Sequence, residues 1–363
     1  MEEKEIKYLL LYSLPKMTER KIRNLLNYFK DIDKIFQADK EEILKVDGID
    51  EEIYNFLKEG INKEIEEKIK IAESLNVKIV SFLDEGYPKN LLRFSDFPPL
   101  LFIRGEIKEE DSLALAIIGT RRASEYSQMI AYRLAKELNN YGITIVSGLA
   151  RGIDSSAHKG AIENDGRTIA VLGCGIDICY PPENKRLMEE IATKGAVISE
   201  FNISTPPESY NFPQRNRIIA ALSLGVIAVA CPIASGVLNT CEWAIDYGIE
   251  VFACPGPLFK KEYEGTNKLI KDGAKIVTKT EDILEELSLP LKKELKKIGI
   301  EIELNEEEKE IIAILNENPI YIDEIAERLN RPINEISEIL LMLEMKGVVK
   351  ELPGKRYMKS LNH

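Results

Sequence analysis

The spacing of apolar residues predicts helices at the start of the chain. Between residues 1 and 75, apolar side chains recur every three or four positions, as in Ile22, Leu25, Leu26 and Phe29, which is the pattern of amphipathic helices. Leu14-Pro15 and the segment 47–50 (DGID) interrupt this pattern, and each precedes another helical stretch. We therefore expect residues 1–75 to form a domain of short helices.

One of these interruptions bears on function. A helix, a short glycine-bearing turn and a second helix resemble a helix-hairpin-helix (SAM-like) module, which aims turn amides at DNA phosphates. Asp50 stands where the second hairpin glycine would be, and its charge would repel a phosphate. Contact with DNA and a scaffold or partner-docking role are both open for this region, and Asp50 favours the second.

From residue 112 to residue 280 the pattern changes to short, continuous apolar runs separated by amphipathic stretches. The runs LALAIIG, ITIVSG, TIAVLG, AVISE, GVIAVAC and EVFACPG are typical of buried strands. Upstream, VKIVSFL indicates one more strand. Regular alternation of strand and helix predicts an α/β fold with a doubly wound parallel sheet and helices on both faces. We assign residues 76–285 to this domain.

Residues 300–363 show the pattern of a small third domain. Three helical stretches are followed by VVKELPGKRYMK, which has a hairpin pattern around Pro353-Gly354. Three helices and a β-hairpin describe a winged helix-turn-helix. The expected recognition helix carries Asn334, Glu335 and Glu338 and is acidic, which favours a protein-interaction role over sequence-specific duplex binding.

Composition places the protein in the cytoplasm. Hydrophobic residues make up 44% of 363 positions, enough for a sizeable core. No apolar run approaches the roughly 18–20 residues that span a bilayer, and the acidic N-terminus has no signal-peptide pattern. The five cysteines are odd in number and form no CxxC pair, so we expect buried apolar thiols and neither a zinc site nor a disulfide framework.

The net charge of −12 is unusual for a protein that binds nucleic acid, but the charges are unevenly distributed. Residues 112–280 contain 18 Lys and Arg against 17 Asp and Glu, whereas the rest of the chain contains 31 against 44. The acidity therefore lies in the flanking regions, and a basic pocket in the central domain is compatible with the composition.

Polar motifs follow the predicted strands of the central domain. Ligands of doubly wound folds bind at the carboxyl edge of the sheet, where helix N-termini direct their amides. Glycines there let the backbone approach a ligand, arginines can bind phosphate with two hydrogen bonds, and an aromatic ring can stack on a base. The candidate phosphate-binding positions after the first three strands are Gly119, Arg121, Arg122, Ser147, Gly148, Arg151 and Lys185. The segment FPQRNR adds Phe212, Arg215, Asn216 and Arg217.

Each of these signals has a structural alternative. Arg151 can pair with Asp154, which is placed to cap the next helix. His158 lies one helical turn after Asp154, so a catalytic pair is conceivable, although a structural hydrogen bond is the simpler interpretation. Several phosphate-binding positions around one edge suit a polymer better than one small molecule.

These motifs together resemble a known family. IIGTRRAS, VSGLARGIDSSAHKGA, TIAVLGCGIDICYPPENKRL, FPQRNRIIAALS, SGVLNT and ACPG, in this order and spacing, are similar to the DNA-processing protein A family, also called DprA or Smf. The resemblance covers residues 80–280 closely and the flanking domains more loosely. The chain departs from the family pattern at Val237 and Asn239, where members usually read SGSLIT, and at Ala230-Cys231.

The resemblance implies an extended Rossmann-like fold that binds single-stranded DNA without sequence preference and acts as a homodimer. It implies a recombination mediator, not an enzyme, that protects incoming DNA and loads the RecA recombinase during natural transformation of competent cells. It places the strand on the glycine, arginine and aromatic positions named above, with no cofactor.

Two enzymatic alternatives rest on related folds. A nucleotide phosphoribohydrolase would carry PGGxGTxxE, and the corresponding segment 234–240 lacks the paired glycines, although Glu242 follows it. A dinucleotide-binding oxidoreductase would carry GxGxxG after the first strand, where this chain has GTRRAS. The sequence thus favours a binding protein over either enzyme.

Overall fold

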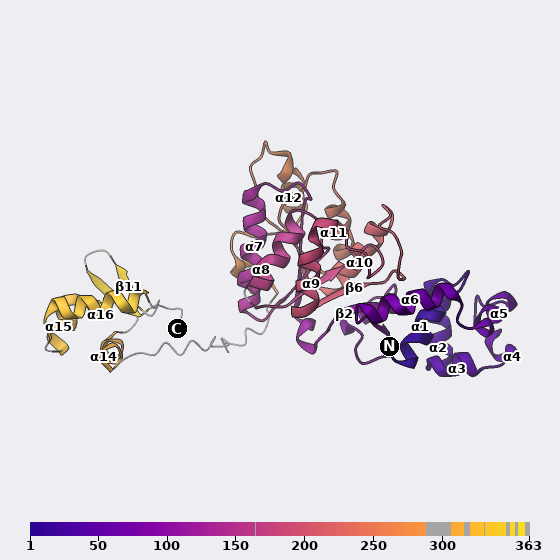
Figure 1. Cartoon of the computed structure of the whole chain (residues 1–363). Coiled ribbons are helices and arrows are strands. Elements are labelled where there is room, and N and C mark those ends of the chain that lie inside the picture. The colour runs from indigo at the N-terminus through magenta and orange to yellow at the C-terminus, as the bar shows by residue number, and fades with distance from the viewer. Residues whose placement is uncertain are drawn as a thin grey trace. The chain divides into compact units, whose positions relative to one another are not determined.

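The predicted parallel sheet is the centre of the computed structural model (Figure 1). Its nine strands lie in the order β1-β2-β6-β5-β4-β3-β7-β8-β9, and all pairs from β6 to β9 are parallel. The strands are β1 (Lys78–Ser81), β2 (Leu100–Gly105), β3 (Ala114–Ile118), β4 (Thr144–Ser147), β5 (Thr168–Val171), β6 (Ala196–Ser199), β7 (Gly225–Ala228), β8 (Glu250–Ala253) and β9 (Lys275–Ile276). The predicted fold class is confirmed.

Helices cover both faces of this sheet, because successive residues of each strand point to opposite sides. Ala116 and Ile118 of β3 pack with α10 and α11, whereas Leu115 and Ile117 pack with α7 and α8. The helices of this region are α7 (Glu125–Asn140), α8 (Ile153–Glu163), α9 (Lys185–Lys194), α10 (Asn211–Leu222), α11 (Gly236–Asp246), α12 (Glu264–Lys271) and α13 (Thr280–Glu286).

From β3 onward, the chain reverses its direction of travel across the sheet once. From β3 it adds β4, β5 and β6 on one side, and it then returns to place β7 on the other side of β3. The loops that leave β3 and β7 therefore diverge, and a crevice opens between them at the carboxyl edge. This topological switch point is where doubly wound folds bind their ligands.

Two features differ from the sequence-based expectations. β1 and β2 join the sheet edge as antiparallel strands instead of extending the parallel order. The amphipathic stretch TCEWAIDYG predicts a helix that starts at Thr240, but α11 begins at Gly236. The start is earlier because the Ser235 side chain accepts a hydrogen bond from the Val237 amide and caps the helix. The segment 236–240 is therefore helical.

Six short helices precede the sheet and share a core with it. They are α1 (Glu3–Ser13), α2 (Glu19–Phe29), α3 (Ile32–Gln37), α4 (Lys40–Ile43), α5 (Glu51–Glu59) and α6 (Lys63–Ser74). Leu9, Leu25 and Ile53 of these helices belong to the same buried cluster as Phe102 of β2 and Val197 of β6. Residues 1–293 form one compact unit, and a boundary at residue 75 stays a prediction.

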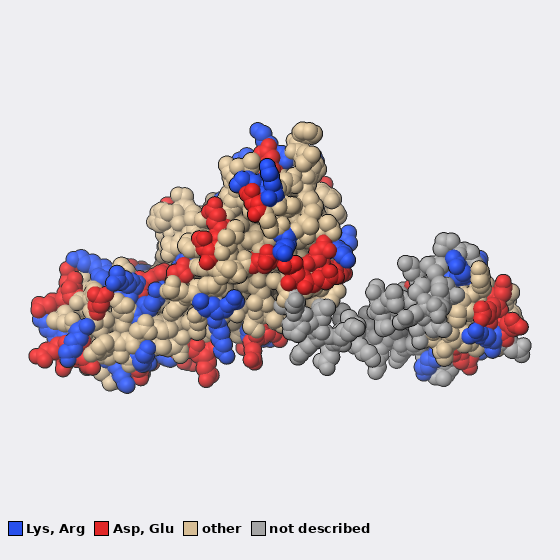
Figure 2. Space-filling model, turned by 180° about the vertical axis from the view of Figure 1, so that it is seen from behind, with Lys and Arg blue, Asp and Glu red and all other residues tan. Residues whose placement is uncertain are grey.

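Two carboxylates lie at the glycine-bearing turn of the N-terminal helices. The Asp50 carboxylate caps α5 by accepting a hydrogen bond of 2.9 Å from the Ile53 amide, and this bond lowers the pKa of Asp50. Asp47 in the same turn pairs with Arg20 at 2.9 Å. On the face shown in Figure 2, acidic and basic side chains are mixed over this part of the molecule.

Residues 294–363 form a second compact unit with winged-helix topology. It contains α14 (Glu306–Ile314), α15 (Ile322–Leu329) and α16 (Ile333–Met345), with a sheet of β10 (Ile320–Tyr321), β12 (Arg356–Lys359) and β11 (Val349–Leu352) in that order. The β11–β12 pairing confirms the hairpin pattern, and Glu335 of α16 contacts Arg331 at 3.6 Å.

The structure describes residues 1–163, 165–287, 306–315, 320–329, 331–345, 349–352 and 355–359. The predicted hairpin tip, Pro353-Gly354, and the side chain of Glu338 lie outside this description. Within it, no helix is both long enough and apolar enough to cross a membrane.

Candidate nucleic-acid interface

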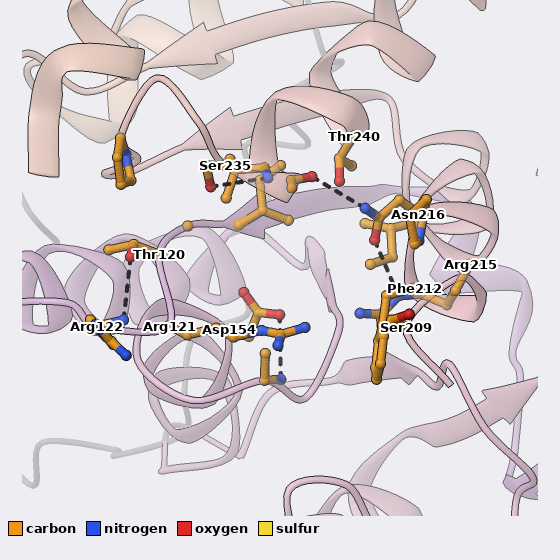
Figure 3. A pocket seen from close by; sticks show the side chains of 18 of the residues that line it. Thr120, Arg121, Arg122, Asp154, Ser209, Phe212, Arg215, Asn216, Ser235 and Thr240 are labelled. Atoms are coloured by element: carbon orange, nitrogen blue, oxygen red, sulfur yellow. Dashed lines mark hydrogen bonds between the residues drawn. The ribbon is translucent and has the colours of Figure 1, made fainter. Parts of the chain in front are cut away.

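A pocket of about 600 Å³ opens at the switch point between β3 and β7 (Figure 3). Its walls come from the segments that follow β3, β4, β5, β6 and β7, all at the carboxyl edge of the sheet. Among the described residues, Arg121, Arg122 and Arg215 line it against a single carboxylate, Asp154. The balance of charge favours an anionic ligand.

The turn after β3 forms one wall and is held by close backbone packing. A Cβ atom on Gly119 would come within 2.4 Å of the Ile153 side chain, so only glycine fits there. Gly152 has a φ of +74°, and its missing Cβ leaves room for the Thr120 carbonyl. These two glycines bring the turns after β3 and β4 together, which places Arg121 and Arg122 at the rim.

Arg121 lies over an aromatic ring. Its guanidinium carbon is 5.1 Å from the centre of the Phe212 ring, and the Tyr180 ring lies 5.6 Å from the same ring. Arg121 and Arg122 are exposed, and neither forms an ion pair with a carboxylate in the described part of the chain. Two uncompensated guanidinium groups beside two aromatic rings match the requirements for binding phosphates and bases together.

Arg215 forms the floor of the pocket and is committed to the protein. Its guanidinium donates hydrogen bonds to the carbonyl oxygens of Gly148, at 2.9 Å, and Val171. Burial lowers the pKa of Arg215 to about 10, and the nearby Asp154 carboxylate opposes this change. Arg215 is charged at neutral pH, so it adds positive potential to the pocket from beneath.

Asp154 balances this buried charge. Its carboxylate accepts hydrogen bonds from the backbone amides of Gly148 and Ala150 at 3.2 and 3.4 Å. Burial raises the pKa of Asp154, and Arg215 opposes the rise. The amides of Gly148 and Ala150 therefore bind Asp154, and the predicted anion site at Ser147-Gly148 is occupied by the protein's own carboxylate.

The wall that follows β7 was not identified from the sequence. Ser235, Gly236 and Thr240 line the pocket, and Asn216 donates a hydrogen bond of 3.3 Å to the Gly236 carbonyl. Asn216 also contacts the Asn239 side chain at 3.3 Å, so the unusual Asn239 supports a predicted site residue. The cap sequence Ser235-Gly236 would have indicated this helix start.

Four predicted residues, Ser147, Gly148, Arg151 and Lys185, do not line the main pocket. Arg151 is exposed but pairs with Glu183, and it lines a small recess beside the pocket with Arg121 and Gly148. Ser147 is buried and donates a hydrogen bond of 2.7 Å to the Ile117 carbonyl. Lys185 is exposed at the start of α9 and does not line the pocket.

Arg217 is not brought to the pocket either. It is 7% exposed and pairs with the fully buried Glu200 and, at 3.6 Å, with Glu19 of α2. It also donates a hydrogen bond of 2.8 Å to the Asp96 carbonyl. Residues 215 and 217 are about 200° apart around a helix, so the two arginines leave α10 in different directions. The grouping of Arg217 with the phosphate-binding residues does not agree with this geometry.

His158 has a structural partner. Its Nδ1 is 2.7 Å from the Thr168 hydroxyl, which itself donates to the Ile145 carbonyl, so Nδ1 carries the proton. Burial lowers the pKa of His158 to about 3, with the Arg215 charge contributing in the same direction. No hydrogen bond joins His158 to Asp154 among the described residues, and a catalytic pair is not formed.

The described residues bring neither a metal-binding cluster nor a cysteine nor Glu242 to the pocket. They contain no group of His, Cys, Asp and Glu side chains that could hold a metal ion. The cysteines are free thiols, four of them buried. Glu242, which a phosphoribohydrolase would use, is exposed and does not line the pocket.

Comparison with known proteins identifies the family. The model of the DNA recombination-mediator protein A family matches residues 78–288, and that of the DprA winged helix domain matches residues 300–355. The chain belongs to this DprA/Smf family. The Smf protein of Escherichia coli is 37% identical over 305 residues, covering 80% of each chain. The DNA processing protein DprA of Streptococcus pneumoniae is 42% identical over 206 residues, 57% of this chain and 73% of that protein.

Solved structures of the family share the fold. The DprA structure from Streptococcus pneumoniae superposes with a TM-score of 0.68 at 34% identity, covering 79% of this chain and 98% of that one. DNA processing protein A from Helicobacter pylori, described for its unique single-stranded DNA binding mode, superposes with a TM-score of 0.54 at 33% identity. It covers 59% of this chain and 96% of its own.

Proposed function

We propose that the switch-point pocket binds single-stranded DNA. The observation that carries this proposal is the placement of two unpaired arginines, Arg121 and Arg122, beside Phe212 in a pocket with a positively charged floor. The Helicobacter pylori relative, described for its binding of single-stranded DNA, supports the same ligand here. A strand needs both a cationic path and an aromatic surface, and this pocket has both.

The surroundings of each residue determine its part in binding the strand. Arg121 and Arg122 contact phosphates, and Phe212 with Tyr180 stacks on a base. Asn216 and the start of α11 line the opposite wall. Arg215 supplies charge without direct contact, because its donors already bind Gly148 and Val171. Gly119 and Gly148 keep the backbone close enough for this arrangement.

We propose further that the protein acts by binding and not by turnover. As a recombination mediator it would hold incoming single strands in the cytoplasm as a homodimer, protect them from nucleases and load RecA during natural transformation. The family's name for the matched region, a recombination mediator, supports this role.

Fluorescence anisotropy with labelled oligo-dT at increasing salt tests the proposal. The logarithm of the association constant should fall linearly with the logarithm of salt concentration, because each phosphate contact releases counterions. Oligo-dA of equal length should bind with similar affinity. Failure of the full-length protein to bind either oligomer below about 100 mM salt would refute the proposal, since electrostatic attraction is strongest there.

A further inference from the structure

One loop exposes an aromatic side chain that nothing in its surroundings explains. The loop between β8 and α12 carries Leu258, 77% exposed, and Phe259, 99% exposed. Leaving a whole phenyl ring in water is unfavourable for an isolated protein, and such rings commonly mark a binding surface. The exposed tip of the loop, residues 257–261 (PLFKK), contains neither sulfur nor histidine, so its chemistry is limited to apolar contact and charge.

The loop is anchored at both ends. Asn267 of α12 donates a hydrogen bond to the Gly256 carbonyl and accepts one from the Gly256 amide. At the other end the Tyr263 side chain is buried, and its hydroxyl lies 2.7 Å from the Ser127 hydroxyl. Phe259 therefore projects from a fixed segment, and ordering it on a ligand costs little conformational entropy.

The same loop contacts the turn that carries the pocket arginines. The Glu262 carboxylate accepts hydrogen bonds from the Ser124 amide at 2.8 Å and from the Ser127 hydroxyl at 2.6 Å. Ser124 follows Arg122 by two residues and Arg121 by three. Phe259 and the pocket rim thus belong to neighbouring segments at one edge of the sheet, joined by direct hydrogen bonds.

The charge beside Phe259 selects the ligand. Lys260 and Lys261 follow it and are both exposed, and Glu262 is engaged by the two serines. In Figure 2, basic and acidic side chains both lie beside uncharged surface at the top of the first unit. A lone aromatic ring followed by two lysines repeats the combination of stacking surface and phosphate-binding charge seen in the pocket.

We propose that Phe259, with Lys260 and Lys261, forms a second base-stacking site for single-stranded DNA. The strand extends from the pocket past Arg122 to this site. The proposal rests on the proposed function of the pocket and extends it from one pocket to a path. One nucleotide binds at Arg121 and Phe212. The strand continues from it, in the 5′ or the 3′ direction, along the rim of the pocket, and one of its later bases stacks on Phe259. Short oligomers reach the pocket alone, and longer ones also reach the loop.

Two oligomers and one substitution test this inference. Affinity for dT6 and dT20 is measured for the wild type, Phe259→Ala and a matched control, Tyr141→Ala. Tyr141 is exposed too but follows the last residue of α7, about 24 Å from the start of that 16-residue helix. We expect Phe259→Ala to weaken dT20 binding about 5- to 20-fold, the scale of one lost base stack, with dT6 unchanged.

Further variants sharpen the test. Phe259→Trp should retain the wild-type affinity for dT20. When 2-aminopurine replaces the base that stacks on Phe259, its fluorescence should be quenched on binding to the wild type and not on binding to Phe259→Ala. Equal dT20 affinities for Phe259→Ala and Tyr141→Ala would overturn the inference. So would a changed sedimentation coefficient with unchanged DNA affinity, because Phe259 would then contact a second copy. Absence of binding by the wild type would refute the pocket's proposed function and the inference with it.

Discussion

Arg215 and Arg217 are two residues apart on α10, yet they belong to two regions with opposite electrostatics. Around Arg215 the sheet edge concentrates positive charge, with Arg121 and Arg122 at the rim and Asp154 as the one carboxylate among the described residues that line the pocket. Around Arg217 the protein concentrates negative charge, with Glu200 and Glu19 on one guanidinium. The first region has guanidinium groups that remain available to an anionic ligand, whereas the guanidinium of Arg217 in the second region is paired with carboxylates.

The second region joins the N-terminal helices to the sheet. Glu19 belongs to α2, Glu200 follows β6, and the Tyr12 hydroxyl of α1 donates to the Glu200 carbonyl at 2.6 Å. Burial raises the pKa of Glu200 well above its ordinary value, the Glu19 carboxylate adds to the rise, and Arg217 opposes it. The comparison teaches that two arginines of one motif can serve binding and folding separately.

We expect the largest effect from Arg217→Met, which should lower the free energy of unfolding. Removing the guanidinium leaves the buried Glu200 unpaired, which costs about 3–5 kcal/mol of unfolding free energy. Urea denaturation measures the loss. The double variant Arg217→Met with Glu200→Met should recover much of it, because no buried charge remains. A stable single variant with weakened DNA binding would mean that Arg217 serves the pocket after all.

The next effect is on binding, from replacing Arg121 and Arg122 by alanine together. Two exposed arginines contribute little to folding, so we expect an unchanged denaturation midpoint. Affinity for oligo-dT should fall by about 10- to 100-fold, and the salt dependence should flatten by about 1.4, since each phosphate contact on a single strand contributes about 0.7. A variant with Lys30 and Lys34 both changed to alanine is the control, and an equal loss there would place the site elsewhere.

Acid should destabilise the region beneath the pocket. His158 has an ordinary pKa near 6.5 and a folded-state pKa of about 3, so the unfolded chain binds a proton that the native state excludes. Stability is therefore fully present above pH 6.5 and declines below it, by about 2 kcal/mol at pH 5 from this group. Histidine NMR provides the readout, because the chain has only two histidines, and titration of His158 near pH 6.5 would contradict the prediction.

We expect the smallest effect, a change in the affinity for oligo-dT, from Glu183→Gln at the rim of the pocket. Arg151 is exposed and held by Glu183, whose pKa is lowered mainly by that contact. Removing the carboxylate charge frees Arg151 for a phosphate, so binding of oligo-dT should tighten by about two- to threefold, as befits an exposed pair. Glu190→Gln, which releases the exposed Arg186 on α9, is the matched control. Equal changes in both would indicate a general effect of net charge.

Much of the architecture was predictable because it depends on local patterns. The alternation of buried runs and amphipathic stretches predicted the parallel sheet, and glycine turns after the strands predicted the site's edge. The winged helix followed from three helices and a hairpin. The antiparallel pairing of β1 and β2 was not predictable, since a strand's direction and neighbour are set by contacts distant in sequence.

The candidate site could be predicted only in part. Gly119, Arg121, Arg122, Phe212, Arg215 and Asn216 lie at one pocket, as their strand-end positions suggested. Ser147, Gly148, Arg151, Lys185 and Arg217 do not line it. Ser147, Gly148, Arg151 and Arg217 bind other groups of the protein, and Lys185 is exposed elsewhere, because partners and position depend on the surroundings and not on the residue type. Ser235 and Thr240 were missed since the start of α11 was placed too late.

By itself, the sequence determined which segments form strands and helices, and which edge gathers the glycines and arginines, because hydrophobic period and turn chemistry are local. The tertiary structure decided which arginines keep a free charge. A guanidinium binds whatever anion comes within reach, and only folding brings Glu200 to Arg217 and Glu183 to Arg151 while it leaves Arg121 and Arg122 open.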